Sequence, residues 1–303
     1  MNYAVNTNSI RKQMTPGEIA RIASRAGCAG IEWGLPAADE AADYVREAVK
    51  ATQAENLKIA GFLNGGKIMQ DKFDRDEIET FCRAIDEEAG EMLDGDTRVP
   101  LRVNPAWFAF DLDESMHQRD SFRDLQDRTR RNLESIVPLS EQYGVRFVFE
   151  THHGNVCASA PLARELVDGL DPAAVGVLWD PANGVHEGFL RPRISAEYLG
   201  EYLASVHVKN IVRTLNAFGE NDGGMPVRAD YSTDIVTAPD AGMIDWVEVL
   251  MALKLVGYDG WLSFEEFFGA DTTPRLKRAR AFMEECLNAA PNGPIEPHLT
   301  MND

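Results

Sequence analysis

Short apolar runs alternate with helical stretches along almost the whole chain of 303 residues, and this alternation limits the possible folds more than any other feature. Eight strand-like runs are expected, each followed by a helical stretch. A closed parallel barrel buries every strand between helices and leaves no sheet edge, so the pattern predicts an α/β protein with a single (β/α)8 TIM barrel. The strand-like runs are Tyr3–Val5, Ala29–Trp33, Leu57–Phe62, Val99–Val103, Val145–Glu150, Val175–Asp180, Ser205–Lys209 and Trp261–Glu265.

The first helix has a clear start signal, because Thr15–Glu18 reads as a capping box with a proline at the first helical position. Pro138 is expected either to kink the long fourth helix or to begin a new helical piece. The expected helical stretches are Thr15–Gly27, Ala37–Glu55, Asp74–Met92, Asp120–Tyr143, Pro161–Leu170, Ala196–Leu203, Ile244–Val256 and Pro274–Asn288.

Two segments stand apart from this alternation. Residues 211–243, after the seventh strand, are rich in Gly, Asn and Asp and are expected to form a long irregular loop over the catalytic face of the barrel. Residues 291–303 read as a C-terminal extension beyond a barrel of residues 1–290. The extension is expected either to pack on a partner subunit of a homo-oligomer, a dimer or a tetramer, or to be disordered.

Charge and composition exclude several classes of partner. The formal net charge of −19 repels polyanions, so nucleic acids and anionic membranes are not expected to bind. The N-terminus has no cationic end followed by an apolar core, and no apolar segment is long enough to span a membrane, which predicts a cytoplasmic protein. The four cysteines have no CxxC spacing, so reduced, mostly buried thiols are expected.

Four consecutive strand-like runs, counted from Phe147–Gly154 (FVFETHHG), end on or near residue types that bind metals: Glu150, Asp180, His207, and Glu265 with Glu266. An unpaired charge is costly at the tip of a buried strand, so the repetition suggests a shared site.

Alternation of side chains along a strand supports that suggestion, because alternate residues of a barrel strand point inward. Leu262 and Phe264 suit the helix layer, which turns Glu265 rather than Glu266 towards the barrel axis. The same reasoning places Glu150, Asp180, His207 and Lys209 inside. These residues lie near the C-terminal ends of their strands, where active sites of this fold occur.

The chain resembles the xylose isomerase-like TIM-barrel superfamily, in its sugar phosphate isomerase/epimerase branch. The resemblance lies in GIEWG, LRVNP, FVFETHHG, LWDPAN, SVHVKN and the closing run IDWVEVLMALKLVGYDGWLSFEEF, which occur in the order typical of the family. It implies that Glu150, Asp180, His207 and Glu265 bind one divalent metal, and that Glu150 and Glu265 are also the catalytic acid/base pair. Three carboxylates and an imidazole favour Mn²⁺, with Mg²⁺ or Co²⁺ as alternatives, over a thiolate-type zinc site.

Other residues near the strand ends are candidates for the pocket. His152 shares the inward parity of Glu150 and is a candidate base or substrate ligand, whereas His153 is expected to be structural. Compared with the family, Asn210 replaces an aspartate after Lys209, and an asparagine stands three residues after Asp180 where several relatives have histidine. Trp33 is a candidate to stack on a sugar, although a tryptophan in such a strand is more often a core residue. The candidate substrate-binding residues are Lys209, Asn183, His186, Trp107, Glu32 and Arg213.

Three functions are compatible with this pattern. The first is a metal-dependent isomerase or epimerase that removes a proton next to the carbonyl of a ketose, aldose or related sugar and forms an enediolate. The second is a lyase or dehydratase acting on keto-sugars, keto-inositols or oxidised glycosides, and the third is a non-catalytic metal- or sugar-binding barrel. The apurinic-site endonucleases of the superfamily are disfavoured by the acidic charge and by the presence of only six histidines. The absence of a Gly-rich phosphate loop favours a non-phosphorylated substrate.

Overall fold

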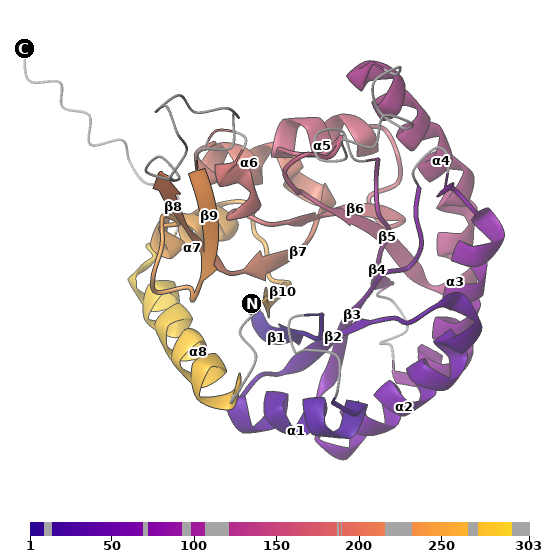
Figure 1. Ribbon diagram of the computed structural model, residues 1–303, viewed down its shortest axis with the longest axis horizontal. Helices are drawn as coiled ribbons and strands as arrows, with labels where there is room; N and C mark the ends of the chain where they lie inside the picture. The colour runs from indigo at the N-terminus through magenta and orange to yellow at the C-terminus, as the bar shows by residue number, and fades with distance from the viewer. Residues whose placement is uncertain are drawn as a thin grey trace, which may run out of the picture.

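The computed structural model of the chain describes residues 1–8, 14–68, 72–92, 98–106, 121–186, 188, 190–215, 232–265 and 272–292. Within these ranges eight parallel strands close into a barrel in the order β1-β10-β7-β6-β5-β4-β3-β2 (Figure 1). The single (β/α)8 barrel predicted from the sequence is confirmed. The barrel strands are β1 (Asn2–Asn6), β2 (Gly30–Gly34), β3 (Lys58–Leu63), β4 (Val99–Arg102), β5 (Val145–Glu150), β6 (Val175–Trp179), β7 (Leu203–Val208) and β10 (Trp261–Phe264).

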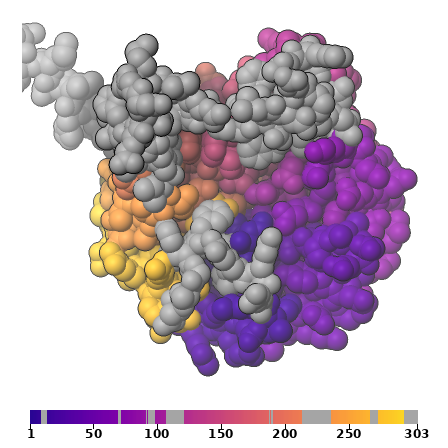
Figure 2. Space-filling view, viewed as in Figure 1, coloured from indigo at the N-terminus to yellow at the C-terminus, as the bar shows by residue number. Residues whose placement is uncertain are grey.

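Helices form a ring outside the strands (Figure 1). The ring closes where the ends of the described chain meet, because β1 pairs with β10 and α1 contacts α8. Figure 2 shows this junction as the meeting of the indigo and yellow regions. The helices are α1 (Pro16–Ala26), α2 (Ala41–Ala54), α3 (Arg75–Ala89), α4 (Phe122–Tyr143), α5 (Ala160–Val167), α6 (Pro192–Leu199), α7 (Trp246–Leu255) and α8 (Thr272–Ala289), with short 3-10 turns η1 (Ala38–Glu40), η3 (Gly90–Met92), η4 (Asn183–Val185) and η5 (Gly200–Tyr202).

The start of α1 follows the sequence closely. Thr15 accepts a hydrogen bond from the backbone N–H of Glu18, and the Glu18 carboxylate accepts from the backbone N–H of Thr15, which completes the predicted capping box. At the other end Gly27 adopts φ +78°, a left-handed conformation that glycine adopts without a steric penalty.

Two helices differ from expectation. α4 is one helix with Pro138 inside it, so a new helix at this proline was a wrong alternative. Ile136 and Leu139, on either side of the proline, are buried. α6 covers Pro192–Leu199 rather than Ala196–Leu203. Pro192 is pre-organised for the first turn, and Gly200 with φ +49° ends the helix before β7 begins.

The connection after β7 is not irregular throughout, as the sequence had suggested. Its two ends pair as an antiparallel ribbon, β8 (Asn210–Leu215) with β9 (Ser232–Thr237). Asn210 ties this ribbon to the segment before α7, because its amide donates to the carbonyls of Pro239 and Ile244 and its Oδ1 accepts from the Ile244 N–H. Asn210, which stands where the family has an aspartate, therefore has a structural role.

The alternation of side chains along the barrel strands is visible in β5. Phe147 and Phe149 are fully buried in the main hydrophobic core, whereas Val148 is buried apart from that core, as expected for a residue facing the barrel interior. Trp33 is also fully buried in the core and donates from Nε1 to Thr52, so of its two alternatives the core position is right and the sugar-stacking one is wrong.

Several expectations concern positions outside the described residues: Trp107, the side chain of Arg213, Glu266, and residues 293–303 of the expected extension. The domain boundary at residue 290 and the homo-oligomer stay predictions. The four cysteines are buried and unpaired. In the described part of the chain, no helix combines the length and apolar character needed to cross a bilayer.

Candidate metal centre

Four metal-binding side chains meet inside the C-terminal end of the barrel. Glu150 ends β5, Asp180 follows β6, His207 lies in β7, and Glu265 follows β10. One ligand atom from each lies within 4.8 Å of the others, and all four residues are buried. The prediction that these side chains converge is confirmed. The arrangement follows from the inward parity of strands that share one end of the barrel.

Two cations are paired with this acidic cluster. The guanidinium of Arg102, at the end of β4, donates to Glu150 Oε2. Lys209, just after β7, places Nζ 2.7 Å from Asp180 Oδ2 and 2.5 Å from Glu265 Oε2. Each of the three carboxylates thus has a positive partner, which offsets the cost of their burial.

The two glutamates are held in the ionised form. Burial alone would raise the pKa of Glu150, but Arg102 and then His207 hold it well below its usual value. Burial acts in the same direction on Glu265, but Lys209 and His207 lower its pKa to about 2. Both carboxylates are therefore able to accept a proton at neutral pH.

Asp180 and His207 both have raised pKa values, so they hold a proton more tightly than the same side chains do in water. Burial raises the pKa of Asp180 to about 6, although Lys209 opposes this shift. Burial would lower the pKa of His207, but surrounding carboxylates, Glu32 first, raise it well above its usual value. Nδ1 of His207 lies 3.3 Å from Glu150 Oε1 and 3.6 Å from Glu265 Oε2. Nε2 faces Glu32 Oε2 at 3.0 Å.

The donor set fits a divalent cation. Three carboxylates and one imidazole nitrogen are oxygen-rich and hard, as Mn²⁺, Mg²⁺ and Co²⁺ require. The ammonium of Lys209 already lies between the carboxylates of Asp180 and Glu265, so this position favours positive charge. A buried cluster of this kind is able to hold a metal ion.

A cavity of about 230 Å³ opens directly above the cluster. Glu150 and Glu265 line it, whereas His207 and Asp180 do not and are almost completely buried beneath it. A small molecule in the cavity can therefore contact the carboxylates of Glu150 and Glu265 but not Asp180 or His207. The lining residues are Asn8, Arg102, Asn104, Pro105, Glu150, His152, Asn155, Lys209 and Glu265.

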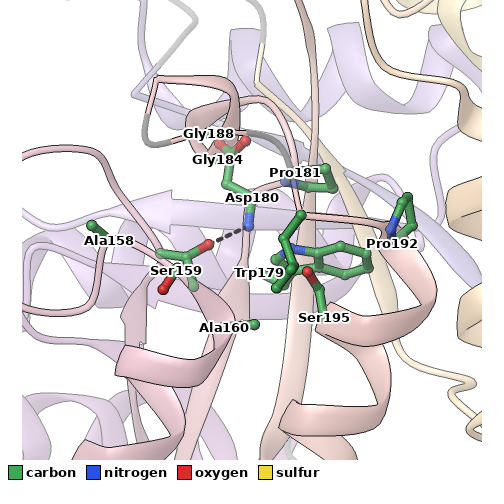
Figure 3. Close-up of a pocket in the computed structure, with 12 residues that line it drawn as sticks. Ala158, Ser159, Ala160, Trp179, Asp180, Pro181, Gly184, Gly188, Pro192 and Ser195 are labelled. Carbon is green, nitrogen blue, oxygen red and sulfur yellow. Dashed lines mark hydrogen bonds between the residues drawn. The ribbon is translucent and has the colours of Figure 1, made fainter.

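Two other cavities are less suited to the chemistry. The pocket in Figure 3, between the end of β6 and the starts of α5 and α6, has a volume of only about 30 Å³ and includes Trp179, Asp180 and Ser195. That space is sufficient for water but not for a sugar. A larger cavity of about 410 Å³ lies at the N-terminal ends of the strands, beside Lys58 and Trp261, and none of the four cluster residues lines it. Active sites of this fold lie at the opposite face.

The structure distributes the other candidate residues between the cavity wall and the layer behind it. His152 and Lys209 line the cavity, as predicted. Asn183 lies behind Glu150, because its amide donates to Glu150 Oε1 at 3.0 Å and to the Thr151 carbonyl at 3.2 Å. This position favours an orienting role over the predicted substrate contact. His186 lies away from the cavity lining and stacks on His153 with ring centroids 3.8 Å apart.

Glu32 also differs from its predicted role. It is 3% exposed and contacts His207 and Ser263 rather than the cavity. Sequence reasoning missed Asn6, whose amide lies 3.3 Å from His207 Nε2, and Arg102. Arg102 was within the quoted LRVNP run, and its place at a strand end was the available signal.

Comparison with known proteins assigns the family. Residues 20–286 match the xylose isomerase-like TIM barrel family, so the chain belongs to this family, as the motifs predicted. The chain is similar to an inosose dehydratase from Bacillus licheniformis, with 23% identity over 232 residues that cover 76% of this chain and 75% of the relative.

Solved structures share the fold at lower identity. A D-psicose 3-epimerase from Clostridium cellulolyticum H10, solved with D-tagatose, has a TM-score of 0.70 and 14% identity over 95% of this chain and 99% of its own. The IOLI protein, solved with a zinc atom, has a TM-score of 0.69 and 15% identity over 96% of this chain and 99% of its own. Membership of the family and the sequence match to the inosose dehydratase identify the chain as an enzyme.

Proposed function

We propose that the protein is a divalent-metal-dependent enzyme that moves a proton on the carbon next to the carbonyl of a sugar or related polyhydroxy ketone, as an isomerase or epimerase. The observation that carries this proposal is the position of Glu150 and Glu265. Both belong to the buried metal-type cluster, and both also line the cavity above it. No other member of the cluster shares the two properties.

In this proposal Glu150, Asp180, His207 and Glu265 hold the ion, most favourably Mn²⁺, with Mg²⁺ and Co²⁺ as alternatives. When bound, the ion supplies positive charge that stabilises the negative charge developing on the substrate carbonyl oxygen. Asn183 and Arg102 hold the Glu150 carboxylate in one orientation through its two oxygens. Lys209 donates to Oε2 of Glu265, and the amide of Asn6 donates to its Oε1.

One cavity-lining glutamate accepts the proton from the substrate carbon, and the second returns a proton to that carbon or to its neighbour. Return to the opposite face of the same carbon gives an epimer. Return to the carbonyl carbon, with the hydroxyl proton of the first carbon passing to the former carbonyl oxygen, gives an isomer. His152 and Asn155 lie on the cavity wall, where they are able to bind hydroxyl groups of the substrate.

A second candidate function is dehydration. It is favoured by the sequence match to an inosose dehydratase. After the same proton removal, a hydroxyl group on the next carbon leaves with the proton held by one glutamate, which forms water and a carbon–carbon double bond. Keto-inositols and other ring ketones with a hydroxyl two carbons from the carbonyl are the matching substrates.

Isotope exchange tests the shared step. Purified protein with Mn²⁺ is incubated in D₂O with panels of keto-sugars and keto-inositols, and the products are analysed by mass spectrometry and NMR. We expect deuterium at the carbon next to the carbonyl in a product of otherwise unchanged mass for an epimerase or isomerase. For a dehydratase we expect deuterium at that carbon in the recovered substrate, together with a product that has lost water, because this carbon keeps no hydrogen after the elimination. Glu150→Gln should suppress the exchange.

A contrary result is equally informative. Turnover of a keto-sugar with no deuterium in the product or the recovered substrate would remove the solvent-exchanging base from the proposal, and would leave Glu150 only its role as a ligand. A protein that takes up no divalent ion and exchanges no proton with either panel would exclude both candidate functions.

A further inference from the structure

We propose that Glu32 is a positioning residue that keeps the proton of the His207 imidazole on Nε2, so that Nδ1 is the nitrogen presented to the metal ion. This inference rests on the proposed function, because it concerns the metal that the cluster would hold. It also gives a role to a buried carboxylate that contacts neither the cavity nor the other three cluster residues.

The two nitrogens of His207 face different surroundings. Nδ1 lies 3.3 Å from Glu150 Oε1, 3.6 Å from Glu265 Oε2 and 3.9 Å from Asp180 Oδ2. Nε2 points away from these three carboxylates and lies 3.0 Å from Glu32 Oε2. A metal held by the four residues therefore meets Nδ1, and Nε2 is left for the proton.

The position of Glu32 is fixed from a distant strand. Glu32 projects from β2 across the barrel interior to β7, and the hydroxyl of Ser263 donates to the same Oε2 at 2.9 Å. Ser263 is the β10 residue paired in register with His207, so the hydroxyl and the imidazole approach Glu32 side by side. A carboxylate that is 3% exposed and accepts two hydrogen bonds on one oxygen has little freedom to turn away.

Asn6 does not offer an alternative acceptor for the Nε2 proton. Its Oδ1 accepts from the Asn8 backbone N–H at 2.8 Å, which turns the NH₂ group towards the cluster. That NH₂ group lies 3.3 Å from His207 Nε2 and 3.4 Å from Glu265 Oε1. An NH₂ group only donates, and Glu265 Oε1 is able to accept from it, so Glu32 is the acceptor for Nε2–H.

A histidine that binds a metal through one nitrogen needs a partner for the proton on the other. The partner fixes the tautomer and the ring orientation, and it makes the ligating nitrogen more basic. Loss of Glu32 would leave the Nε2–H buried without its acceptor and would let the proton move to Nδ1, where it blocks the metal. The main consequence should be weaker metal binding.

The test compares Glu32→Gln with Glu32→Met in the full-length protein. Gln retains an oxygen that accepts from Nε2–H, whereas Met has similar volume and no acceptor of comparable strength. We expect Glu32→Met to weaken Mn²⁺ binding by about 10–100-fold, and Glu32→Gln to recover most of that loss. Binding is measured by calorimetric titration of Mn²⁺ alone, after the circular dichroism of each metal-free variant has been matched to the parent.

A second measurement identifies the tautomer of His207 and does not depend on enzymatic activity. The protein is labelled with ¹⁵N-histidine, loaded with diamagnetic Mg²⁺, and its histidine ring nitrogens are assigned by long-range ¹H–¹⁵N correlation. We expect the His207 proton on Nε2 in the parent protein and in Glu32→Gln. A packing defect alone would not move the proton between the nitrogens.

The outcomes separate the two proposals. If the parent protein binds Mn²⁺ and folded Glu32→Met binds it equally well, or if the proton lies on Nδ1 in the loaded parent, the role of Glu32 is wrong and the metal site stands. If the parent protein binds no divalent ion, the proposed function fails and the role of Glu32 fails with it. If Glu32→Met does not fold, the tautomer decides. A proton on Nε2 in both the parent and Glu32→Gln supports the role of Glu32, and a proton on Nδ1 in either protein overturns it.

Discussion

The two halves of the barrel contribute different chemistry to the same site. The second half supplies all four metal-type ligands, from β5, β6, β7 and β10. The first half supplies residues that hold those ligands: Asn6 from β1, Glu32 from β2 and Arg102 from β4. Within the described residues, the four ligands thus come from one side of the barrel and are oriented partly from the other, while Asn183 and Lys209 of the second half also hold carboxylates of the cluster.

This division separates affinity from orientation. The four ligands in the second half form the donor set that a cation needs, so the loss of one of them should remove binding or catalysis outright. Residues of the first half act through hydrogen bonds to those ligands, and such partners typically alter metal affinity or activity by about 10–100-fold. Substitutions on the two sides should therefore differ in size as well as in kind.

The largest effect is expected at Glu265. Glu265→Gln removes a charged ligand and one of the two carboxylates that reach the cavity. We expect kcat to fall by at least about 10²–10⁴-fold, the usual contribution of a general acid or base. Steady-state kinetics on the substrate found by isotope exchange measure the loss.

Glu266→Gln is the matched control, because strand alternation predicts that Glu266 faces away from the barrel axis. It should keep most of the parent activity. If Glu266→Gln were inactive and Glu265→Gln active, the assignment of the inner face on this strand would be wrong by one residue.

Substitution of Lys209 tests whether a bound metal ion replaces the ammonium group beside the carboxylates of Asp180 and Glu265. Lys209→Met leaves Asp180 and Glu265 buried without their ammonium partner. Breaking a buried ion pair in this way costs about 3–5 kcal/mol, so the metal-free variant should unfold at a clearly lower temperature. Saturating Mn²⁺ should restore more stability to the variant than to the parent, since the ion replaces the missing charge.

The readout for Lys209→Met is the melting temperature with chelator and with Mn²⁺, in parallel with the parent. Lys254→Met is a suitable control, because the bonds of Lys254 to described residues go to backbone carbonyls near the end of α8, away from the cluster. An equal gain from Mn²⁺ in Lys209→Met and in the parent would show that the lysine and the ion do not share the carboxylates.

The next effect in size is the pH dependence of metal stabilisation. The pKa of Asp180 is raised to about 6 and that of His207 well above its usual value, so both groups stabilise the metal-free fold at low pH and lose that contribution as the pH rises through the raised values. A metal requires both groups without the ligand proton, so its binding releases protons and strengthens with pH.

We therefore expect the stabilisation by Mn²⁺ to grow from about pH 5 to about pH 8 and to reach about 2.7 kcal/mol when the ion is at 100 times its Kd. Thermal melts at several pH values, with and without Mn²⁺, measure the difference. A gain that is largest at the acidic end would contradict the assignment of Asp180 and His207 as ligands.

The same division between the halves shows what could be predicted from the sequence. Glu150, Asp180, His207 and Glu265 were predictable because each ends or follows an apolar run, and because the period of two along a strand tells which side chain faces inward. Glu32 and Asn183 were assigned to the cavity although they lie behind its wall. For Glu32, alternation along a strand gives the face but not the depth along the barrel axis, which depends on register. Asn183 lies in the 3-10 turn η4, where strand alternation does not apply.

Other features depend on contacts between distant segments. The pairing of Arg102 with Glu150 joins residues 48 positions apart. No feature of the sequence around either residue indicates this contact. The β8–β9 ribbon was missed because its strands are short and polar, while Asn210 fixes its base through contacts up to 34 residues away. The start of α1 was predictable because capping is a local interaction, confined to four residues.

The smallest expected effect lies in the first half of the chain and away from the site. Thr15→Ala removes the side-chain oxygen that caps α1, which should lower the free energy of unfolding by about 1 kcal/mol. Thr15→Ser keeps a capping hydroxyl and should unfold like the parent in urea. Neither variant should change the Kd for Mn²⁺, because Thr15 contacts no residue of the cluster. If Thr15→Ala weakened metal binding as much as Glu32→Met, metal affinity would follow global stability, and the orienting role of the first-half strands would lose its support.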